Sequence, residues 1–387
     1  MLRRHLNFLI VASENLFRYK GRSIVVILCL VAILFPFITA IALSEGVKSQ
    51  SLISVENGAD IYLTYDQYGR NAEVPLSIIK EIQGFDGVLR VIPRVIGRAF
   101  IGNYLSVVVG IPSKEIPSSI LLEKGDIFKE SNDVIIGAGL AKALNLEIGN
   151  SFILDINKTK ILKVSGIFSS QSSIWSSDLI FASFDDAAEI FRKDGVASDL
   201  LIYVRPGYVA SIAEVLNLLH EGDAKRPLIR IQTKDLVRQY FTKGFTMKQG
   251  IFTALYTVAF ALAIPALLVV SGFGMGERRR EIGIIKAIGW QTSEIIEVVF
   301  IENLLISLTA APLALIASFV WIKFFNGFLI AQFFIAEIGI LAKFPVPARY
   351  MPVPIFLGFA FALILTMVGS IYSTWRSAVT PPAVTMK

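Results

Sequence analysis

The sequence feature that most restricts the fold of this chain is a basic stretch at residues 276–290, GERRREIGIIKAIGW, which lies between two long apolar runs. Three consecutive arginines, Arg278 to Arg280, would each cost about 2.5–3.5 kcal/mol at the centre of a membrane helix, and a neighbouring Leu or Ile offsets only about 0.3–0.6 kcal/mol. The stretch is therefore predicted to be a short helical loop between two membrane spans. Because lysine and arginine accumulate in cytoplasmic loops, we expect it on the cytoplasmic side.

The composition indicates a membrane anchor joined to a sizeable water-soluble portion. Of the 387 residues, 54% are hydrophobic and only 18% are charged, and the mean hydropathy is +0.63. That is too apolar for a soluble globular protein, yet the apolar residues are unevenly distributed. Much of the net charge of +6 flanks the apolar runs, so it indicates membrane orientation and no nucleic-acid partner. The single cysteine, Cys29, excludes an intramolecular disulfide.

The apolar runs predict four membrane spans in a 1+3 arrangement. Residues 1–22 are basic and amphipathic and predict a cytoplasmic helix on the inner membrane surface. Residues 23–43 predict the first span; a cleaved signal peptide fits less well, because its apolar region is usually only about 7–15 residues long. The remaining predicted boundaries are a second span at 249–276, a cytoplasmic coupling loop at 277–291, a third span at 292–322, an external connection at 323–349, a fourth span at 350–375 and a cytoplasmic tail at 376–387. Both termini are then cytoplasmic.

Between the first two spans, residues 44–248 predict one large domain on the opposite side of the membrane. Turn residues return there, and no uncharged run reaches the length of a span. Strand patterns cover Asp60–Tyr65, Val88–Ile92, Ser106–Ile111, Asp133–Ile136, Phe152–Ile156, Ile161–Ile167 and Asp199–Val204. Helix patterns cover Pro75–Ile82, Gly139–Leu146, Asp185–Phe191 and Tyr208–His220. The alternation predicts α+β or α/β packing.

The basic loop resembles the coupling loop of FtsX-like, MacB-type ABC transporter permeases, whose usual form is close to E-R-x-R-E-I-G-I-x-K-A-I-G. Residues 57–63 and 135–150 resemble parts of the MacB-like extracytoplasmic domain. The resemblance implies four transmembrane helices with a large α+β extracytoplasmic domain after the first. It further implies a membrane-proximal lobe at 58–97 and 198–232, a distal lobe at 98–197, and helical stalks at 44–56 and 233–248. Thr233 is a good N-cap for the second stalk.

In that family the loop carries the helix that docks on a separate cytoplasmic ABC ATPase. The resemblance therefore assigns ATPase coupling to Glu277, Arg278, Arg279, Arg280, Glu281, Ile282, Gly283, Ile284, Lys286 and Gly289. An ordinary cytoplasmic loop would explain the arginines but not the isoleucine–glycine pattern. Glu302, an ionisable residue at the inner part of the third span, is expected to have a charge partner such as a loop arginine.

The sequence contains no sign of catalysis by this chain. A G-x-x-x-x-G-K-[ST] phosphate cradle is missing, so we expect ATP and Mg to be bound by the partner ATPase and no cofactor by this chain. The only histidines, His5 and His220, have no Cys or His neighbour at metal-ligand spacing. No nucleophile elbow accompanies His220. We therefore expect neither catalytic residues nor a metal site.

The resemblance implies a permease of the cytoplasmic (inner) membrane, which works with a second permease copy as a homodimer or related heterodimer. Hydrolysis of ATP by the partner would move the external domain and so export or extract an amphiphilic substrate, such as a lipoprotein, lipid, drug, peptide or haem. A periplasmic adaptor or lipoprotein carrier and membrane lipid are further expected partners. The alternative is an FtsX-type signal transmitter that activates an extracytoplasmic cell-wall hydrolase without transport, and a weaker third option is a membrane-anchored sensor. The sequence identifies no substrate-contacting residues.

Overall fold

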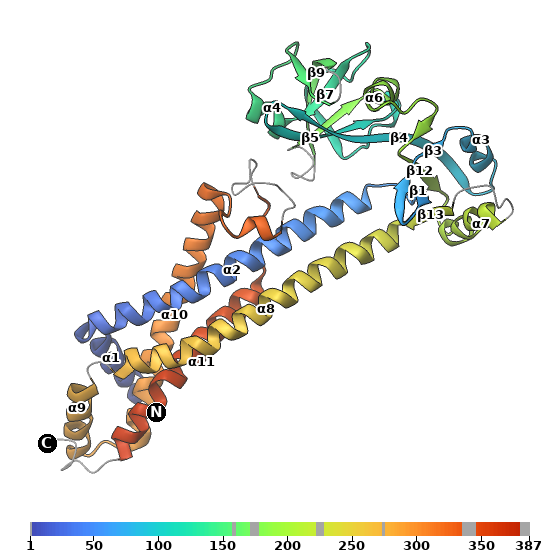
Figure 1. Cartoon of the computed structure of the whole chain (residues 1–387). Helices are drawn as coiled ribbons and strands as arrows, with labels where there is room; N and C mark the ends of the chain where they lie inside the picture. Colours follow the sequence, from blue (N-terminus) through green and yellow to red (C-terminus); the bar gives the residue numbers. More distant parts are fainter. Residues whose placement is uncertain are drawn as a thin grey trace. The chain divides into compact units, whose positions relative to one another are not determined.

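The computed structural model describes residues 2–156, 160–170, 178–221, 228–272, 275–334 and 346–379 (Figure 1). The chain forms two compact units. We call residues 1–46, 246–342 and 348–387 the helical unit, and residues 47–245 and 343–347 the sheet unit. The predicted external connection at 323–349 and the predicted tail at 376–387 lie partly outside the described residues.

The helical unit combines long apolar helices with shorter polar ones. They are α1 (Leu2–Arg18), α2 (Lys20–Glu56), α8 (Lys234–Gly272), α9 (Met275–Ala287), α10 (Thr292–Phe325), the 3₁₀ turn η2 (Ala331–Phe333) and α11 (Pro352–Val379), of which α2 and α8 extend into the sheet unit. Within the described part of the chain, three helices are long and apolar enough to cross a membrane, at Lys20–Glu56, Lys234–Pro265 and Thr292–Phe325. The corresponding segment of α11, Pro352–Val368, is shorter, so the count of four spans stays a prediction.

Small and polar side chains fill the contacts between these helices. Leu30 and Leu34 of α2 pack in one buried cluster with Ala310 and Ala314 of α10 and with Ala362 of α11. Small residues let helix backbones approach closely, which stabilises helix contacts where the surroundings are also apolar. Hydrogen bonds add to this packing: Thr39 Oγ1 donates to Ser318 Oγ over 3.0 Å, and Asn303 Nδ2 donates to Ser370 Oγ over 2.6 Å.

The sheet unit is an α+β structure. Its strands are β1 (Ile61–Gln67), β2 (Arg70–Ala72), β3 (Val74–Pro75), β4 (Val88–Ile101), β5 (Tyr104–Gly110), β6 (Ile120–Gly125), β7 (Asp133–Gly137), β8 (Ser151–Leu154), β9 (Lys160–Ser170), β10 (Leu179–Ala182), β11 (Val196–Ala197), β12 (Asp199–Val204) and β13 (Leu228–Thr233). Its helical elements are α3 (Ile78–Gln83), η1 (Ser113–Glu115), α4 (Ala138–Leu144), α6 (Phe184–Phe191) and α7 (Val209–Glu221). The main path of the sheet runs β13-β1-β12-β4-β5-β10-β7-β9-β6. Only the β5–β10 and β7–β9 pairs on this path are parallel, which favours α+β over α/β packing.

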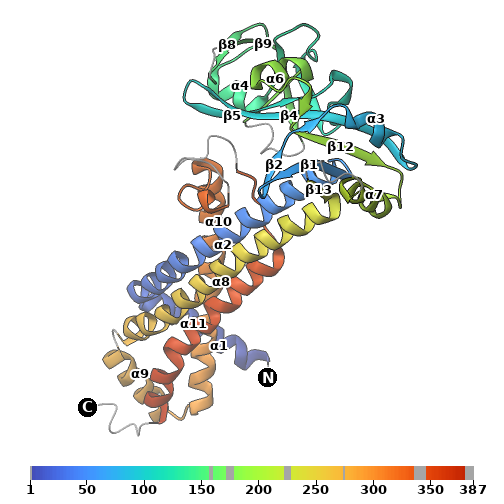
Figure 2. The same cartoon turned by 45° about the vertical axis from the view of Figure 1, so that its right-hand side comes forward.

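One long strand, β4, belongs to both halves of the sheet unit (Figure 2). Its first part, up to Arg94, pairs with β12, and its second part, from Val95, pairs with β5. We call the side with β13, β1, β12 and the first part of β4 the proximal half. The side with the second part of β4, β5, β10, β7, β9 and β6 is the distal half. The change of partner therefore lies between Arg94 and Val95, a few residues before the lobe boundary expected at residues 97 and 98.

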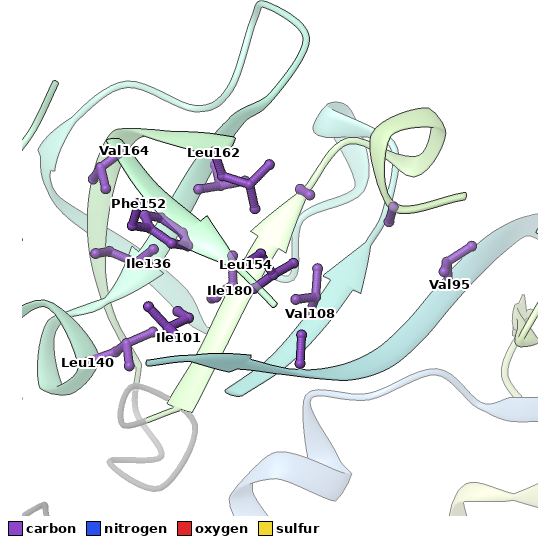
Figure 3. Close-up of a cluster of buried hydrophobic side chains, with 14 of the residues drawn as sticks. Val95, Ile101, Val108, Ile136, Leu140, Phe152, Leu154, Leu162, Val164 and Ile180 are labelled. Atoms are coloured by element: carbon purple, nitrogen blue, oxygen red, sulfur yellow. The ribbon is translucent and has the colours of Figure 1, made fainter. Parts of the chain in front are cut away.

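Each half has its own apolar core. The proximal core includes Ile61, Leu63 and Ile202 on one face of the sheet, together with residues of α3 and α7. The distal core includes Ile136, Leu154, Leu162 and Ile180, together with residues of α4 and α6 (Figure 3). A third buried cluster, which contains Ile92, Phe168 and Phe181, includes residues of both halves.

The point where β4 changes partner is held by polar contacts. Arg94 donates two hydrogen bonds to the Asp199 carboxylate, Nε to Oδ1 over 2.9 Å and Nη2 to Oδ2 over 2.5 Å. Burial lowers the pKa of Arg94, but the charge and hydrogen bonds of Asp199 more than offset this effect, so the pKa is raised overall. Ser198 Oγ accepts a hydrogen bond from the backbone N–H of Ile96 over 2.9 Å.

Two glycines let α6 approach the sheet at this point. A Cβ atom on Gly97 of β4 would lie 2.1 Å from the ring of Phe191, and one on Gly110 of β5 would lie 2.2 Å from Cβ of Ala187. Side chains at these two positions would push α6 away, so the close packing of α6 on β4 and β5 requires glycine at both.

Candidate functional site

The predicted coupling segment folds as the helix α9, Met275–Ala287, at the same end of the helical unit as the beginning of α10 (Figures 1 and 2). Glu277, Arg278 and Arg279 belong to this helix by their backbone, and their side chains lie outside the described residues. Gly289 ends the segment with φ +102°, a left-handed conformation that glycine adopts without steric cost. A capping box of Gln291 and Glu294 then begins α10.

Part of the predicted apolar face of this helix is used to fold it. Ile282 is only 4% exposed and packs with Ile295 of α10, next to Ile285 and Trp290. Gly283 is buried as well. The exposed apolar side chains are instead Ile284 at 48% and Ile288 at 72%. Among the residues whose side chains are described, the apolar face available to a partner consists of Ile284 and Ile288, with exposed Arg280 beside them and half-buried Lys286.

The N-terminal helix α1 contacts α9, a link that the sequence did not indicate. Arg18 Nη1 lies 3.1 Å from Glu281 Oε1. Because the Arg18 side chain is 70% exposed, this ion pair adds little stability, but it fixes which turn of α9 faces α1. Glu281, predicted to contact the ATPase, thus has a partner within the chain.

Three further contacts attach α1 to α10. Phe8 and Ala12 of α1 are buried with Val298 of α10, and the ring of Phe8 lies 5.5 Å from that of Trp290. His5 Nδ1 is 2.5 Å from Glu297 Oε1. Asn15 Nδ2 donates to Glu302 Oε1 over 2.8 Å. α1 therefore packs against the first part of α10 and contacts α9 through the Arg18–Glu281 ion pair.

Glu302 is buried, with 5% of its surface exposed, and Asn15 is a hydrogen-bond partner for its carboxylate. The expected pairing with a loop arginine stays a prediction, because the side chains of Arg278 and Arg279 are not described. Asn15 was missed because it is 287 positions away in the chain. The amphipathic pattern of residues 1–22 was the only signal that some part of α1 would be buried.

Among the residues that the structure describes, no three His, Cys, Asp or Glu side chains are grouped so as to hold a metal ion. The arrangement at α9 supports binding of a protein surface, since it combines a rigidly held helix, exposed isoleucines and cationic side chains.

Two family models match the chain. The model of the MacB-like periplasmic core domain matches residues 23–221, and the model of the FtsX-like permease C-terminal domain matches residues 253–382. Neither describes an enzyme. No curated protein matches the chain.

Two solved structures are similar to part of it. The periplasmic region of MacB from Actinobacillus actinomycetemcomitans is 17% identical, with a TM-score of 0.37 over 50% of this chain and 98% of that one. The extracellular domain of the noncanonic ABC-type transporter YknZ from Gram-positive bacteria is 15% identical, with a TM-score of 0.36 over 45% of this chain and 99% of that one. On the strength of the family models, which together extend from residue 23 to residue 382, the chain belongs to the FtsX-like, MacB-type family of ABC transporter permeases.

Proposed function

We propose that this chain couples ATP hydrolysis by a separate cytoplasmic ABC ATPase to movement of the sheet unit, and so exports or extracts an amphiphilic substrate. The family implies the ATPase partner. The main support for the proposal is that α9 packs against its neighbours on one side and has exposed isoleucines on another. This helix is held by Ile282 on α10 and by Glu281 on α1, while Ile284 and Ile288 stay exposed one helical turn apart. An exposed apolar face on a fixed helix fits a groove on a partner protein.

The docking role is tested by placing a charge on the exposed face. Ile284→Asp should reduce co-purification of the cognate ATPase by at least roughly tenfold, because docking would bury an unpaired carboxylate. Ser293→Asp is the matched control: this residue is also exposed and lies just beyond the loop, so its substitution should leave co-purification unchanged. Equal recovery of the ATPase with wild type and Ile284→Asp would refute the docking role.

The proposed topology places α9 and both termini in the cytoplasm and the sheet unit outside. After replacement of Cys29 by Ser, a cysteine at Tyr68, a sheet-unit residue that is 99% exposed, should react with an impermeant thiol reagent in intact spheroplasts. A cysteine at Lys286 should be labelled only after the membrane is opened. The reverse pattern would overturn the topology.

We propose that a second copy of the permease contacts the exposed apolar side chains of α8. Ile251, Leu255, Val258 and Leu262 recur at three- or four-residue spacing on α8 and are each more than half exposed in the single chain. Cross-linking through cysteines at these positions would detect a dimer contact, and its failure at every position would leave α8 facing lipid.

Transport and signalling can be distinguished by which molecule stimulates ATP hydrolysis by the complex of permease and ATPase. When the permease and ATPase are reconstituted together, a transporter should hydrolyse ATP faster in the presence of a lipid, lipoprotein or drug substrate. Stimulation only by an extracytoplasmic cell-wall hydrolase would favour the FtsX-type signal transmitter instead.

A further inference from the structure

A polar pocket opens among four helices of the helical unit, apart from the exposed face of α9. Its walls come from the end of α1, the beginning of α2, the first half of α10 and the second half of α11. Arg22 of α2 and Glu302 of α10 both line it, so the pocket holds one cationic and one anionic side chain. The proposed coupling role assigns no use to it.

The sequence places this pocket at the level where the helices leave the apolar core. Arg22 is the last charged residue before the uncharged run of α2, and Glu302 is the last charged residue before the uncharged run of α10. On α11, Thr374 lines the pocket two residues before Arg376, where the uncharged run of that helix ends. In a bilayer, charged residues at the ends of apolar runs lie at the headgroup level.

Part of the polar lining is buried. Glu302 is 5% exposed and accepts a hydrogen bond from Asn15 Nδ2 over 2.8 Å. Thr366 and Thr374, each 4% exposed, add hydroxyl groups to the wall formed by α11. An ionisable group buried at this depth usually has a functional reason.

Apolar side chains line the pocket as well, beside the polar Thr366 and Ser370 of α11. Val26 of α2, 6% exposed, and Ile306 of α10, 8% exposed, both face the pocket. A complementary ligand therefore needs three features: an anionic group for the guanidinium, a cationic hydrogen-bond donor for the carboxylate, and an aliphatic part for the apolar lining. A phospholipid whose headgroup carries a primary amine has all three.

We propose that this pocket binds the headgroup of an aminophospholipid. The phosphate lies at Arg22, where charge-assisted hydrogen bonds form, and the ammonium donates to Glu302. The first methylenes of the acyl chains contact Val26 and Ile306. A choline headgroup cannot donate a hydrogen bond to the carboxylate, and a glycerol headgroup has no positive charge, so the site should select against both. The assignment does not depend on ATPase coupling; only its placement in the inner leaflet rests on the proposed topology.

The test uses the purified full-length chain in detergent, stripped of lipid and then offered equal amounts of phosphatidylethanolamine, phosphatidylcholine and phosphatidylglycerol with identical acyl chains. Native mass spectrometry counts the lipids retained on each chain. Wild type should retain phosphatidylethanolamine at least roughly tenfold better than either of the others. Equal retention of the three lipids would overturn the proposal.

Two variants separate the roles of the charged residues. Glu302→Gln keeps an oxygen that accepts from Asn15 but removes the charge, so the preference for phosphatidylethanolamine over phosphatidylcholine should disappear. Arg22→Gln should weaken retention of all three phospholipids together, because they share the phosphate. Glu297→Gln is the control, since Glu297 is on the same helix but contacts His5 outside the pocket. An undiminished preference in Glu302→Gln would overturn the proposal; if that variant does not fold, wild-type selectivity and Arg22→Gln decide.

A further arm distinguishes a lipid from a soluble molecule with the same headgroup. Glycerophosphoethanolamine in large excess should leave the bound phosphatidylethanolamine in place, because it lacks the acyl chains that contact Val26 and Ile306. Complete displacement would show that the site recognises the headgroup alone, and the lipid assignment would then be wrong. The assay contains no ATPase, so failure of the coupling proposal would not affect its result.

Discussion

The interiors of the sheet unit and the helical unit are built from different side chains. Large aliphatic and aromatic residues such as Leu154 and Phe168 are completely buried in the sheet unit. In the helical unit, small residues such as Ala310 and Ala314 are completely buried beside polar ones such as Ser318. Burial from water contributes roughly 25 cal/mol per Å² of apolar surface, whereas helices in lipid are already in apolar surroundings and gain stability from close packing and hydrogen bonds. The same type of substitution should therefore have different effects in the two units.

The largest effect is expected in the sheet unit. Phe168→Ala should destabilise it by about 3–5 kcal/mol, because the change removes apolar contacts and leaves a cavity beside Phe181, whose ring centroid is 5.4 Å away. Hydrogen exchange of the β9 amides in the full-length chain, measured in increasing urea, reports this unit. Ile153→Ala, at a side chain that is 55% exposed, should cost less than about 0.5 kcal/mol. Similar losses in both variants would contradict the description of this core.

The next effect tests the charged pair within the same unit. Arg94→Met should cost about 3 kcal/mol, the lower end of the range for breaking a buried ion pair, because the Arg94 side chain is 23% exposed. The loss arises mainly because Asp199 is left without its partner. The double variant Arg94→Met, Asp199→Leu should recover most of the stability in the same exchange experiment. If the double variant is as unstable as the single one, the Arg94–Asp199 pair itself stabilises the point where β4 changes partner, and the unpaired Asp199 is not the main cause of the loss.

A smaller effect is expected for a hydrogen bond in the helical unit, where such bonds add to the apolar packing of residues such as Leu30 and Leu34. Asn303→Leu removes the 2.6 Å hydrogen bond to Ser370 and should cost about 0.6–1.7 kcal/mol. Unfolding in mixed micelles of increasing denaturing detergent measures this change. Leu308→Ala is the contrasting control: its side chain is 50% exposed, so in lipid its loss should have almost no effect. A large loss for Leu308→Ala would place this residue in an interface.

The smallest effect is a change in the alkaline stability of the sheet unit. Burial raises the pKa of Tyr203 above its usual 10.0, although nearby Arg90 and Arg94 act in the opposite direction. The folded state therefore keeps this proton after the unfolded chain has lost it. The resulting stability is complete below about pH 10 and is lost as the pH rises through the native pKa. Tyr203→Phe should lose less stability than wild type between about pH 9 and about pH 11. Tyr68→Phe, at an exposed tyrosine, should behave as wild type.

Sequence patterns predicted the regular elements of the sheet unit well where one face is buried. The strand predicted at Asp199–Val204 is β12, and the helices predicted at Asp185–Phe191 and Tyr208–His220 are α6 and α7 with small shifts at their ends. The predicted N-cap of α8 is confirmed, because Thr233 Oγ1 accepts from the backbone N–H of Leu236 over 3.3 Å. Gly149 makes the turn into β8 with φ +84°.

The errors have local physical reasons. β6 was missed because its residues are almost all exposed and so show no alternation of apolar and polar side chains. The second part of β4 was missed because Pro93 and Gly97 are poor strand residues, and here the pairing of Pro93 with β12 and of Gly97 with β5 outweighs that tendency. The helical conformation of α9 was predicted from its residues, and its coupling role stays a prediction. The burial of Ile282 and the contact with α1 depend on tertiary packing between distant parts of the chain, which local patterns do not contain.

The shared strand β4 also has a consequence for how this sheet unit could have changed during evolution. The chain enters the distal half after Arg94 and returns at Asp199, and these two residues are hydrogen-bonded to each other. An inserted segment whose two ends are adjacent in the structure can change in length or sequence with little effect on the proximal half. The contact between Arg94 and Asp199, which lie outside the segment, keeps its ends together. Related permeases could therefore vary the distal half while keeping β11, which pairs with β3 and places Ala197 in the proximal core.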